Sequence, residues 1–371
     1  MSRRPGAAWN WRRMPMEAES PEEYGYERIR ANLAESSCRD RRLRDLNLDL
    51  DELLLLYGDH RGIPELRAII GAEAGLGQDD VLTTAGAAMA LFLVHATLLA
   101  PDAHLIVVRP NYATNLETPF AIGCAVSYID LTLEEGFRID VDKVAAAITP
   151  ATTLISVTTP HNPTGVEIDE PTLRALMHLA ERNHCHLLVD ETYRDMSAAA
   201  VPIAASMSDR VISVSSVSKT YGIPGIREGW VTCADRSLME RMLAAKEQIV
   251  LTGSVLDEAI ALSVLLRKDE LLPVVRAHIA AQREVVVSFM ANEPRLEWAV
   301  PTGGVVAFPR IRSEANVDTT KFYRTLLDAG VFVGPGHWFD QDPRHFRIGW
   351  GWPTPDELVY GLRSISESLG A

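Results

Sequence analysis

The sequence has little positive charge and no long apolar run, and each shortage excludes a class of protein. Among its 371 residues, 36 Lys and Arg stand against 50 Asp and Glu, which gives a net charge of −14. A nucleic-acid-binding protein needs a basic face to neutralise phosphates, so this balance argues against nucleic acid and against anionic membrane surfaces as partners. The most apolar segment, Thr84–Ala100, is short for a membrane span and contains His95, so we interpret it as a buried helix.

Cysteine is also scarce. Cys38, Cys124, Cys185 and Cys233 form no CxxC pair and have no histidine at zinc-site spacing, so we expect no metal site. This usage is typical of reduced thiols in a cytoplasmic protein. A GxGxxG motif after the first strand is absent, which disfavours NAD. The basic start, MSRRPGAAWNWRRMP, has no apolar core region, so we interpret it as a flexible arm and not as a secretory signal.

Short β-branched runs alternate with helical patterns through the first two thirds of the chain. The expected strands are Leu105–Pro110, Ala125–Asp130, Leu154–Pro160, His186–Glu191 and Val211–Val217. Continuous apolar strands that alternate with helices predict a parallel sheet covered on both faces, the α/β class. After about residue 255 a long helical stretch, expected to break or kink near Pro273, leads to short strands and helices of a smaller α+β domain.

Polar side chains follow the predicted strands where the strands end. Tyr112, Asn162 and Lys219 each lie two residues after one of these runs, and Asp190 lies at the end of another. Ligands of open parallel sheets bind at the carboxyl ends of the strands. We therefore expect a ring, an amide, a carboxylate and an amine on one rim of the sheet.

The segment around Lys219 combines an amine with groups suited to phosphate. An isolated lysine is more often a solvated surface side chain, but at a desolvated strand end it is a nucleophile toward aldehydes or a general base. Ser216, Ser218 and Arg227 would form an anion cradle beside it.

A second phosphate-binding feature is expected where the glycine of TTAGAAMAL opens a helix. The N–H groups of Ala87 and Ala88 would face outward there, at the positive end of the helix. A plain helix start is the alternative.

Four other side chains have a functional and a structural interpretation. Asp190 could pair with a protonated pyridine nitrogen, or serve as a helix cap or ion-pair partner. Tyr193 could hydrogen-bond a phenolate oxygen and Tyr112 could stack on a planar ring, although either could pack in the core. Asn162 precedes a proline, so its backbone is extended, and an Asx turn is the alternative. Arg347 in FRIGW indicates a bidentate carboxylate partner or a structural salt bridge.

These features follow one another on successive strand ends. With this order of features, the sequence resembles the class I/II aminotransferases of the fold-type-I pyridoxal-phosphate (PLP) enzymes. SVSKTYGIPGIREGW matches the S-x-S-K…G…R signature, and HNPTG matches N-P-T-G. The resemblance runs from YGDHRGIPELR to FRIGW. It implies a large domain whose mainly parallel seven-stranded sheet is sandwiched by helices, plus a smaller α+β domain. It divides the chain into an N-terminal arm and part of the small domain (1–54), a large PLP-binding domain (55–255) and a C-terminal small domain (256–371).

The resemblance also implies a role for each candidate residue. Lys219 would hold PLP as an internal aldimine and carry the proton, and Asp190 would pair with the pyridinium nitrogen; with Tyr193 they form the expected catalytic set. The other contacts it implies are Tyr193 and Asn162 at the ring O3′, Tyr112 on the ring face, and Ala87, Ala88, Ser216 and Arg227 at the phosphate. Tyr57 would reach the phosphate of the neighbouring subunit, which implies a homodimer with shared active sites. Arg347, with Asn162, would bind the α-carboxylate of the substrate.

Three functions remain open at this point. The first is an aminotransferase that moves an amino group from an L-amino acid to a 2-oxo acid. The second keeps PLP but is a β-eliminating lyase, or a decarboxylating or oxidative enzyme of specialised metabolism. The third, a non-catalytic regulator with a DNA-binding module, is disfavoured by the acidic charge and the lack of a winged-helix pattern.

Departures from the family pattern bear on this choice. Ala87 and Ala88 stand where many relatives carry a hydroxyl residue, and Asn32–Cys38 (NLAESSC) stands where relatives place a glycine-containing substrate loop, which leaves Ser36 without an assigned role. Both departures favour the second function. KEQIVLTGSVLDEA contains no Arg, which disfavours a strict aspartate enzyme.

Overall fold

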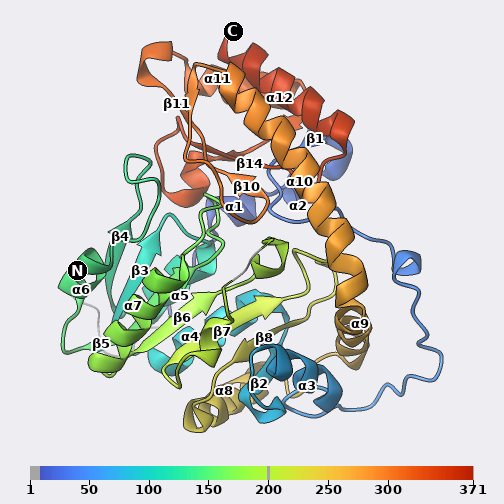
Figure 1. The fold of residues 1–371 in the computed structure, drawn as a ribbon, viewed down its shortest axis with the longest axis vertical. Helices are drawn as coiled ribbons and strands as arrows, with labels where there is room; N and C mark the ends of the chain where they lie inside the picture. Colours follow the sequence, from blue (N-terminus) through green and yellow to red (C-terminus); the bar gives the residue numbers. More distant parts are fainter. Residues whose placement is uncertain (1–8, 199–200, 371) are drawn as a thin grey trace.

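The computed structural model describes residues 9–198 and 201–370, so the first eight residues of the predicted arm lie outside the described residues. Its centre is a seven-stranded sheet (Figure 1). In spatial order the strands are β2 (Val81–Thr84), β8 (Gly229–Thr232), β7 (Val211–Ser216), β6 (His186–Asp190), β5 (Thr152–Thr158), β3 (His104–Arg109) and β4 (Ala125–Asp130). Only β8 runs antiparallel to its neighbours, so the predicted α/β class with a mainly parallel seven-stranded sheet is confirmed.

Helices cover both faces of the sheet. They are α3 (Pro64–Glu73), α4 (Gly86–Leu98), α5 (Ala113–Ile122), α6 (Val141–Ala147), α7 (Glu170–Arg182), α8 (Arg236–Ile249) and α9 (Val255–Leu266). Successive side chains of a strand point to opposite faces. Accordingly, Ile106 and Val108 pack with α6 and α7, whereas Leu105 and Val107 pack with α4, α5 and α8. This two-sided burial explains why the strands are continuously apolar.

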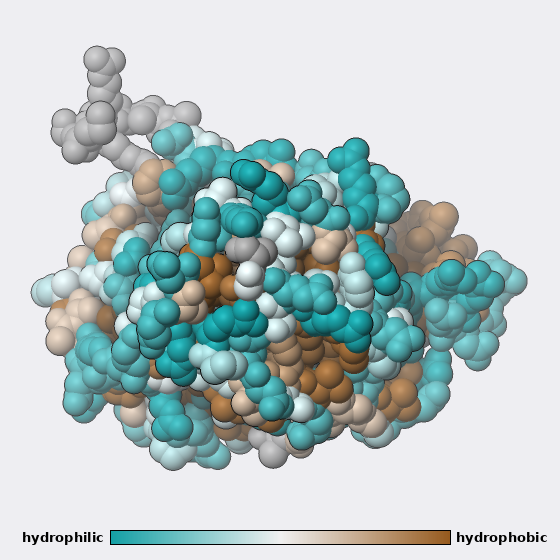
Figure 2. Space-filling view, turned by 90° about the horizontal axis from the view of Figure 1, so that it is seen from above, coloured by the Kyte–Doolittle hydropathy of each residue, from teal (hydrophilic) through white to brown (hydrophobic). Residues whose placement is uncertain are grey.

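The remaining elements form a smaller layer at the α11–α12 end of the molecule, the upper part of Figure 1. The helices are α1 (Pro15–Ala18), α2 (Pro21–Tyr24), α10 (Lys268–Asn292), α11 (Thr319–Asp328) and α12 (Pro355–Leu369). The strands are β1 (Ala31–Asn32), β9 (Leu296–Glu297), β10 (Val306–Ala307), β11 (Arg310–Ile311), β12 (Val331–Phe332), β13 (Gly334–Pro335) and β14 (Phe346–Gly349). Because β1 pairs with β12, an N-terminal strand belongs to this C-terminal layer. Seen from this end, the surface is mostly hydrophilic, with apolar side chains gathered in a few places (Figure 2).

The long helical stretch breaks at a different residue from the one predicted. Helix α9 ends at Leu266 and α10 begins at Lys268, whereas Pro273 lies inside α10. The break therefore lies at Arg267, six residues before Pro273, and the alternative of a kink at Pro273 stays a prediction. Pro273 is the sixth residue of α10, where a proline removes a single early backbone hydrogen bond. The division into parts at residues 54 and 255 stays a prediction. Helix α9 itself packs with α3 and with Val81 of β2.

In the described part of the chain, no helix is both long and apolar enough to cross a membrane. The segment Thr84–Ala100 contributes α4, whose Ala90, Leu91, Leu93 and Val94 are buried against the sheet. The interpretation of this segment as a buried helix is thus correct.

Candidate active site

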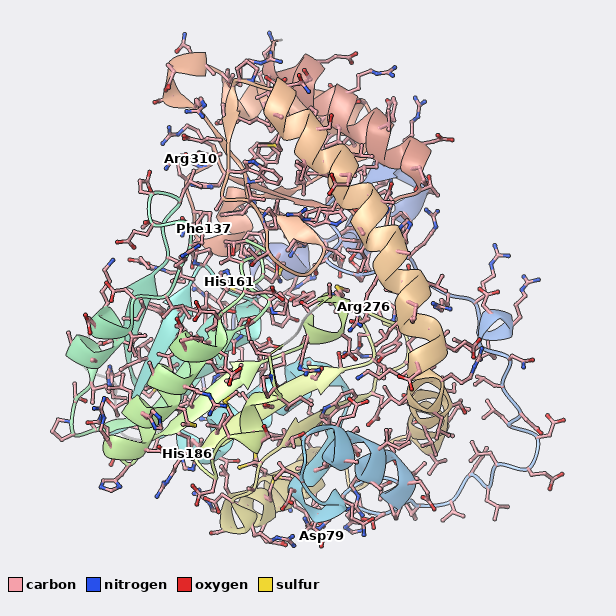
Figure 3. All side chains as sticks on the ribbon, viewed as in Figure 1. Asp79, Phe137, His161, His186, Arg276 and Arg310 are labelled. Carbon is pink, nitrogen blue, oxygen red and sulfur yellow. The ribbon has the colours of Figure 1, made fainter. Side chains whose placement is uncertain are left out.

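The carboxyl ends of β3, β5, β6 and β7 open on a cavity of about 310 Å³. The structure brings together ten of the predicted site residues in its lining. They are Ala87, Ala88, Tyr112, Asn162, Asp190, Tyr193, Ser216, Lys219, Arg227 and Arg347. A larger cavity of about 990 Å³, lined by Phe137 and His161 among others (both labelled in Figure 3), contains none of them. The smaller cavity is therefore the candidate site.

Lys219 lies three residues beyond the end of β7, in the turn that closes the strand. Its carbonyl oxygen accepts a hydrogen bond from the Cys38 N–H at 2.9 Å. This bond ties the lysine turn to an N-terminal segment almost 200 positions earlier in the chain. The amine is therefore held on a rigid strand end, where a positioned nucleophile or base is most precise.

Asp190, the last residue of β6, is 4% exposed. Its Oδ1 accepts two hydrogen bonds, from the Thr192 N–H at 3.1 Å and from the Thr192 hydroxyl at 2.6 Å. Burial raises the pKa of the Asp190 carboxyl, while the Thr192 hydrogen bonds and the charge of Lys219 oppose that rise. A buried carboxylate of this kind is stabilised by a cationic partner in the cavity.

The far end of the cavity is a cradle for an anion. Helix α4 begins at Gly86, and its N-cap residue, Ala85, provides no side-chain cap for the first amides. Those amides, including that of Ala87, carry the positive end of the helix dipole. Gly86 has φ +78°, and a Cβ there would lie 2.3 Å from Arg227 Nη2, so the guanidinium packs directly on the glycine backbone.

Arg227 is held from its other side by oxygen acceptors. Its Nη1 donates to the Pro224 carbonyl at 2.7 Å and to the Ser218 hydroxyl at 3.5 Å. Ser216, 4% exposed at the end of β7, lies in the same wall of the cavity. Arg227, these hydroxyls and the α4 amides together offer donors to a phosphate group.

Arg347 projects from β14 in the opposite layer of the molecule. It is 5% exposed, and its Nη1 donates to Asn162 Oδ1 at 2.9 Å. Its Nη2 donates to the Ala34 carbonyl, whereas its Nε has no hydrogen-bond partner among the described residues. Burial lowers the pKa of the Arg347 guanidinium, and the nearby Tyr193 and Glu35 oppose that effect. An incompletely paired, buried guanidinium is suited to binding a carboxylate.

Tyr193 and Asn162 have protein partners in the structure. The Tyr193 hydroxyl donates to Ser36 Oγ at 3.0 Å, and Asn162 accepts from Arg347. Tyr112 is the N-cap residue of α5, and its backbone N–H donates to Asn111 Oδ1 at 2.7 Å. The side chains predicted to contact the cofactor ring therefore surround one space, and their contacts with that ring stay predictions.

Tyr57 does not line this cavity. It is 79% exposed, in the extended segment before α3. Leu54, Leu55 and Leu56 beside it are also exposed. The predicted contact of Tyr57 with a neighbouring subunit remains a prediction.

One wall of the cavity comes from the N-terminal segment and contains Met16, Glu17, Ser20, Pro21, Glu22, Glu35 and Ser36. The sequence analysis singled out only the part of this wall in Asn32–Cys38, by its position relative to the family's substrate loop, and gave it no role. No motif identifies the part from Met16 to Glu22, because α1 and α2 are only four residues long and carry no strand-end pattern. Trp338 also lines the cavity, and its Nε1 donates to Glu19 at 2.9 Å.

The donor set of the cavity fits one aldehyde cofactor with a phosphate and a basic ring nitrogen. The α4 amides, Ser216 and Arg227 could hold the phosphate, and the buried Asp190 could pair with the protonated ring nitrogen. Lys219, between them, could bind the aldehyde covalently. PLP has all three of these groups.

Comparison with known proteins decides the family. The model of the family described as aminotransferase class I and II matches residues 33–365. The chain belongs to this family. Its members are enzymes that use PLP, so the predicted family, enzyme class and cofactor are confirmed.

Individual relatives differ in their reactions. The chain is 34% identical to capreomycidine synthase of Streptomyces vinaceus, over 87% of this chain and 83% of that protein. It is 30% identical to arginine–pyruvate transaminase AruH of Pseudomonas aeruginosa, over 84% of this chain and 80% of that protein. Among solved structures, the PLP-dependent cyclase OrfR superposes with a TM-score of 0.85 at 26% identity, covering 98% of this chain and 99% of that one.

Proposed function

We propose that the protein is a PLP-dependent aminotransferase that moves the amino group of an L-amino acid to a 2-oxo acid. The observation that carries the proposal is the presence of Arg347 and Lys219 in one cavity. Arg347 offers a buried, incompletely paired guanidinium for the α-carboxylate, and Lys219 offers the amine. Small amino and 2-oxo acids are the substrates that this pair of groups would bind.

PLP, when bound, supplies an electrophilic aldehyde and a ring that withdraws electrons from the α-carbon of the amino acid. Lys219 Nζ would hold the cofactor between turnovers and then move the proton at the α-carbon. Asp190 would keep the ring nitrogen protonated from the end of β6. Arg347, held in place by Asn162 and the Ala34 carbonyl, would fix the direction of the substrate.

A homodimer in the cytoplasm is part of the proposal. The exposed run Leu54–Tyr57 is an apolar surface of the kind that a second copy covers. Burying that run in a dimer would bring Tyr57 to the partner's site, as the family resemblance implies. All four cysteines are free, which supports a reducing compartment.

A second reaction, in which the same groups lead to elimination or ring closure, is favoured by one observation. Two relatives are named as a synthase and a cyclase, not as transaminases. In this chain the segment Asn32–Cys38 replaces the expected glycine-containing loop, and its Ser36 bonds Tyr193. An altered wall beside Tyr193 and Lys219 could change where the proton is delivered.

One experiment separates the two reactions. The holoenzyme is mixed with single amino acids, arginine included, without an oxo acid, while the cofactor absorbance and the products are followed. Loss of the absorbance with one oxo acid formed per site supports transamination. Repeated turnover with restored absorbance and a dehydrated, deaminated or cyclic product would refute it and favour the second reaction.

Two lysine variants provide the controls. Lys219→Ala should lose turnover and covalent cofactor attachment. Lys143→Ala removes a surface lysine that pairs with Glu135, and it should behave like the parent. Equal activity of both variants would show that the proposed role of Lys219 is wrong.

A further inference from the structure

The wall of the cavity opposite the sheet is acidic. Glu17 lies in α1, Glu22 lies in α2, and Glu35 follows β1. In the ranges that the structure describes, none of the three carboxylates has a Lys, Arg or His nitrogen within 4.0 Å. By contrast, Glu19, which directly follows α1, and Glu23, in α2, pair with His337 and Arg13. In this N-terminal segment, the carboxylates that line the cavity are those without an ion-pair partner.

The positively charged residues of the cavity do not neutralise this wall once the cofactor and the substrate α-carboxylate are bound to them. Lys219, Arg227 and Arg347 are the positively charged residues of its lining. In the proposed function they serve the cofactor aldehyde, the phosphate and the substrate α-carboxylate, in that order. Asp190 pairs with the ring nitrogen. In the described part of the chain, three carboxylates on the substrate side therefore remain without a cationic partner, the partly buried Glu35 and the exposed Glu17 and Glu22.

Glu35 lies closest to the carboxylate-binding group. The carbonyl of Ala34, the residue before Glu35, accepts a hydrogen bond from Arg347. A single peptide unit therefore connects Glu35 to the group that binds Arg347. Its own carbonyl packs against β14, because a Cβ at Gly349 would lie 1.8 Å from Glu35 O. Burial raises the pKa of the Glu35 carboxyl, and the charges of Lys219 and Arg347 oppose that rise. The backbone thus fixes Glu35 at the substrate end of the cavity.

A second observation independently indicates a ligand here. Arg347 is buried, its Nη1 and Nη2 donate to Asn162 and to the Ala34 carbonyl, and its Nε is unpaired among the described residues. It lines the same cavity as the three glutamates, so a zwitterionic head group has a site next to an acidic wall. A ligand that binds both has a carboxylate at one end and a positive charge at the other.

We infer that the substrate is an α-amino acid with a cationic side chain, a guanidinium or an ammonium, bound by Glu35 with Glu17 and Glu22. The inference rests on the proposed function and adds the substrate class. Glu35, fixed by its backbone contacts, sets the specificity. The two N-terminal glutamates supply the outer part of a negative pocket, where a carboxylate binds a guanidinium or ammonium through charge-assisted hydrogen bonds.

The test compares ligands that differ in charge and little in shape. Holoenzyme is titrated with L-arginine and L-citrulline, and with L-lysine and L-norleucine, and the dissociation constant is read from the cofactor absorbance. Exchange of the α-proton with deuterated solvent is followed by NMR. We expect arginine or lysine to bind about tenfold to a hundredfold more tightly than its neutral counterpart.

Two variants assign the effect to the cavity. Glu35→Gln keeps the shape and should remove most of the preference for the cationic ligand while leaving the affinity for the neutral ligand unchanged. Glu23→Gln, on α2 and paired with Arg13, should change neither. Circular dichroism melts check that both variants fold. An equal loss for cationic and neutral ligands in Glu35→Gln would refute a specificity role.

The outcomes also separate this inference from the proposed function. Exchange of the α-proton of neutral or acidic amino acids, with no preference for cationic ones, would overturn the substrate class and leave the proposed function standing. Tight PLP binding with no absorbance change and no exchange for any amino acid would overturn both.

Discussion

Replacement of Gly86 by alanine tests the proposal that Arg227 and the start of α4 bind the cofactor phosphate. A Cβ at this position would lie 2.3 Å from Arg227 Nη2, far inside van der Waals contact, so the guanidinium must move. If Arg227 donates a charge-assisted hydrogen bond to the phosphate, its displacement costs about 1.5–3 kcal/mol of binding free energy. Since about 1.4 kcal/mol corresponds to tenfold, PLP should bind roughly tenfold to 150-fold more weakly.

The backbone of Gly86 complicates the comparison, because its φ of +78° is unfavourable for alanine in any surroundings. Gly136→Ala is the matched control, since Gly136 has φ +64° and nothing within 4 Å of the added Cβ. Both variants should lose about 1–2 kcal/mol of folding stability in urea titrations, and only Gly86→Ala should lose PLP affinity in fluorescence titrations of the apoenzyme. Equal PLP affinity of the two variants would refute the assignment of Arg227 to the phosphate.

Two further predictions concern buried ionisable groups away from the cavity. Lys246 is 0% exposed, donates to the His60 carbonyl at 2.7 Å and lies near the buried Glu258. Lys246→Met should therefore lower the free energy of unfolding by about 3–5 kcal/mol in a urea titration. Lys143→Met, on the surface, should change that free energy little in the same titration. Burial lowers the pKa of His95 to about 3 and of His161 to about 4. At each of these two positions the unfolded chain therefore binds more protons below about pH 6.5, and each histidine should cost about 2 kcal/mol of stability between pH 7 and pH 5. Buried carboxyls such as Glu191, whose pKa burial raises to about 7, act in the opposite direction. The measurement is therefore the difference in pH dependence between the parent and His161→Gln in urea titrations, and equal pH dependence of the two would contradict this expectation.

The sheet was predictable because its strands are buried on both faces. A continuous apolar run such as that of β3 places Ile106 against α7 and Leu105 against α4, and both contacts favour an apolar side chain. The cofactor half of the cavity was predictable for a related reason. Parallel strands end at one edge, so residues that follow them in the chain meet in space.

Elements positioned by distant contacts were not predictable. Strand β8 has four residues and runs antiparallel, and its place beside β2 depends on Gly229, where a Cβ would lie 2.6 Å from the Ala87 amide nitrogen. A local pattern contains no information about such a contact. The helix break is a similar case. Pro273 is the stronger local signal, yet the helix is interrupted at Arg267, whose Nη1 donates to the Leu46 carbonyl at 2.8 Å.

The two halves of the cavity therefore have different origins in the sequence. The cofactor half comes from strand ends, whose spacing is constrained by the sheet itself. The proposed substrate half combines Arg347 of β14 with an N-terminal segment. The contacts that hold this segment include Leu33 O with the Gly349 N–H at 2.7 Å, the Cys38 N–H with Lys219 O, and Ser36 with Tyr193. Because these contacts involve mostly backbone atoms, side chains such as Glu35 can change without loss of the fold. The substrate wall can thus diverge between relatives while the strand-end residues stay in place, which is consistent with the similarity of this chain to both a transaminase and a cyclase.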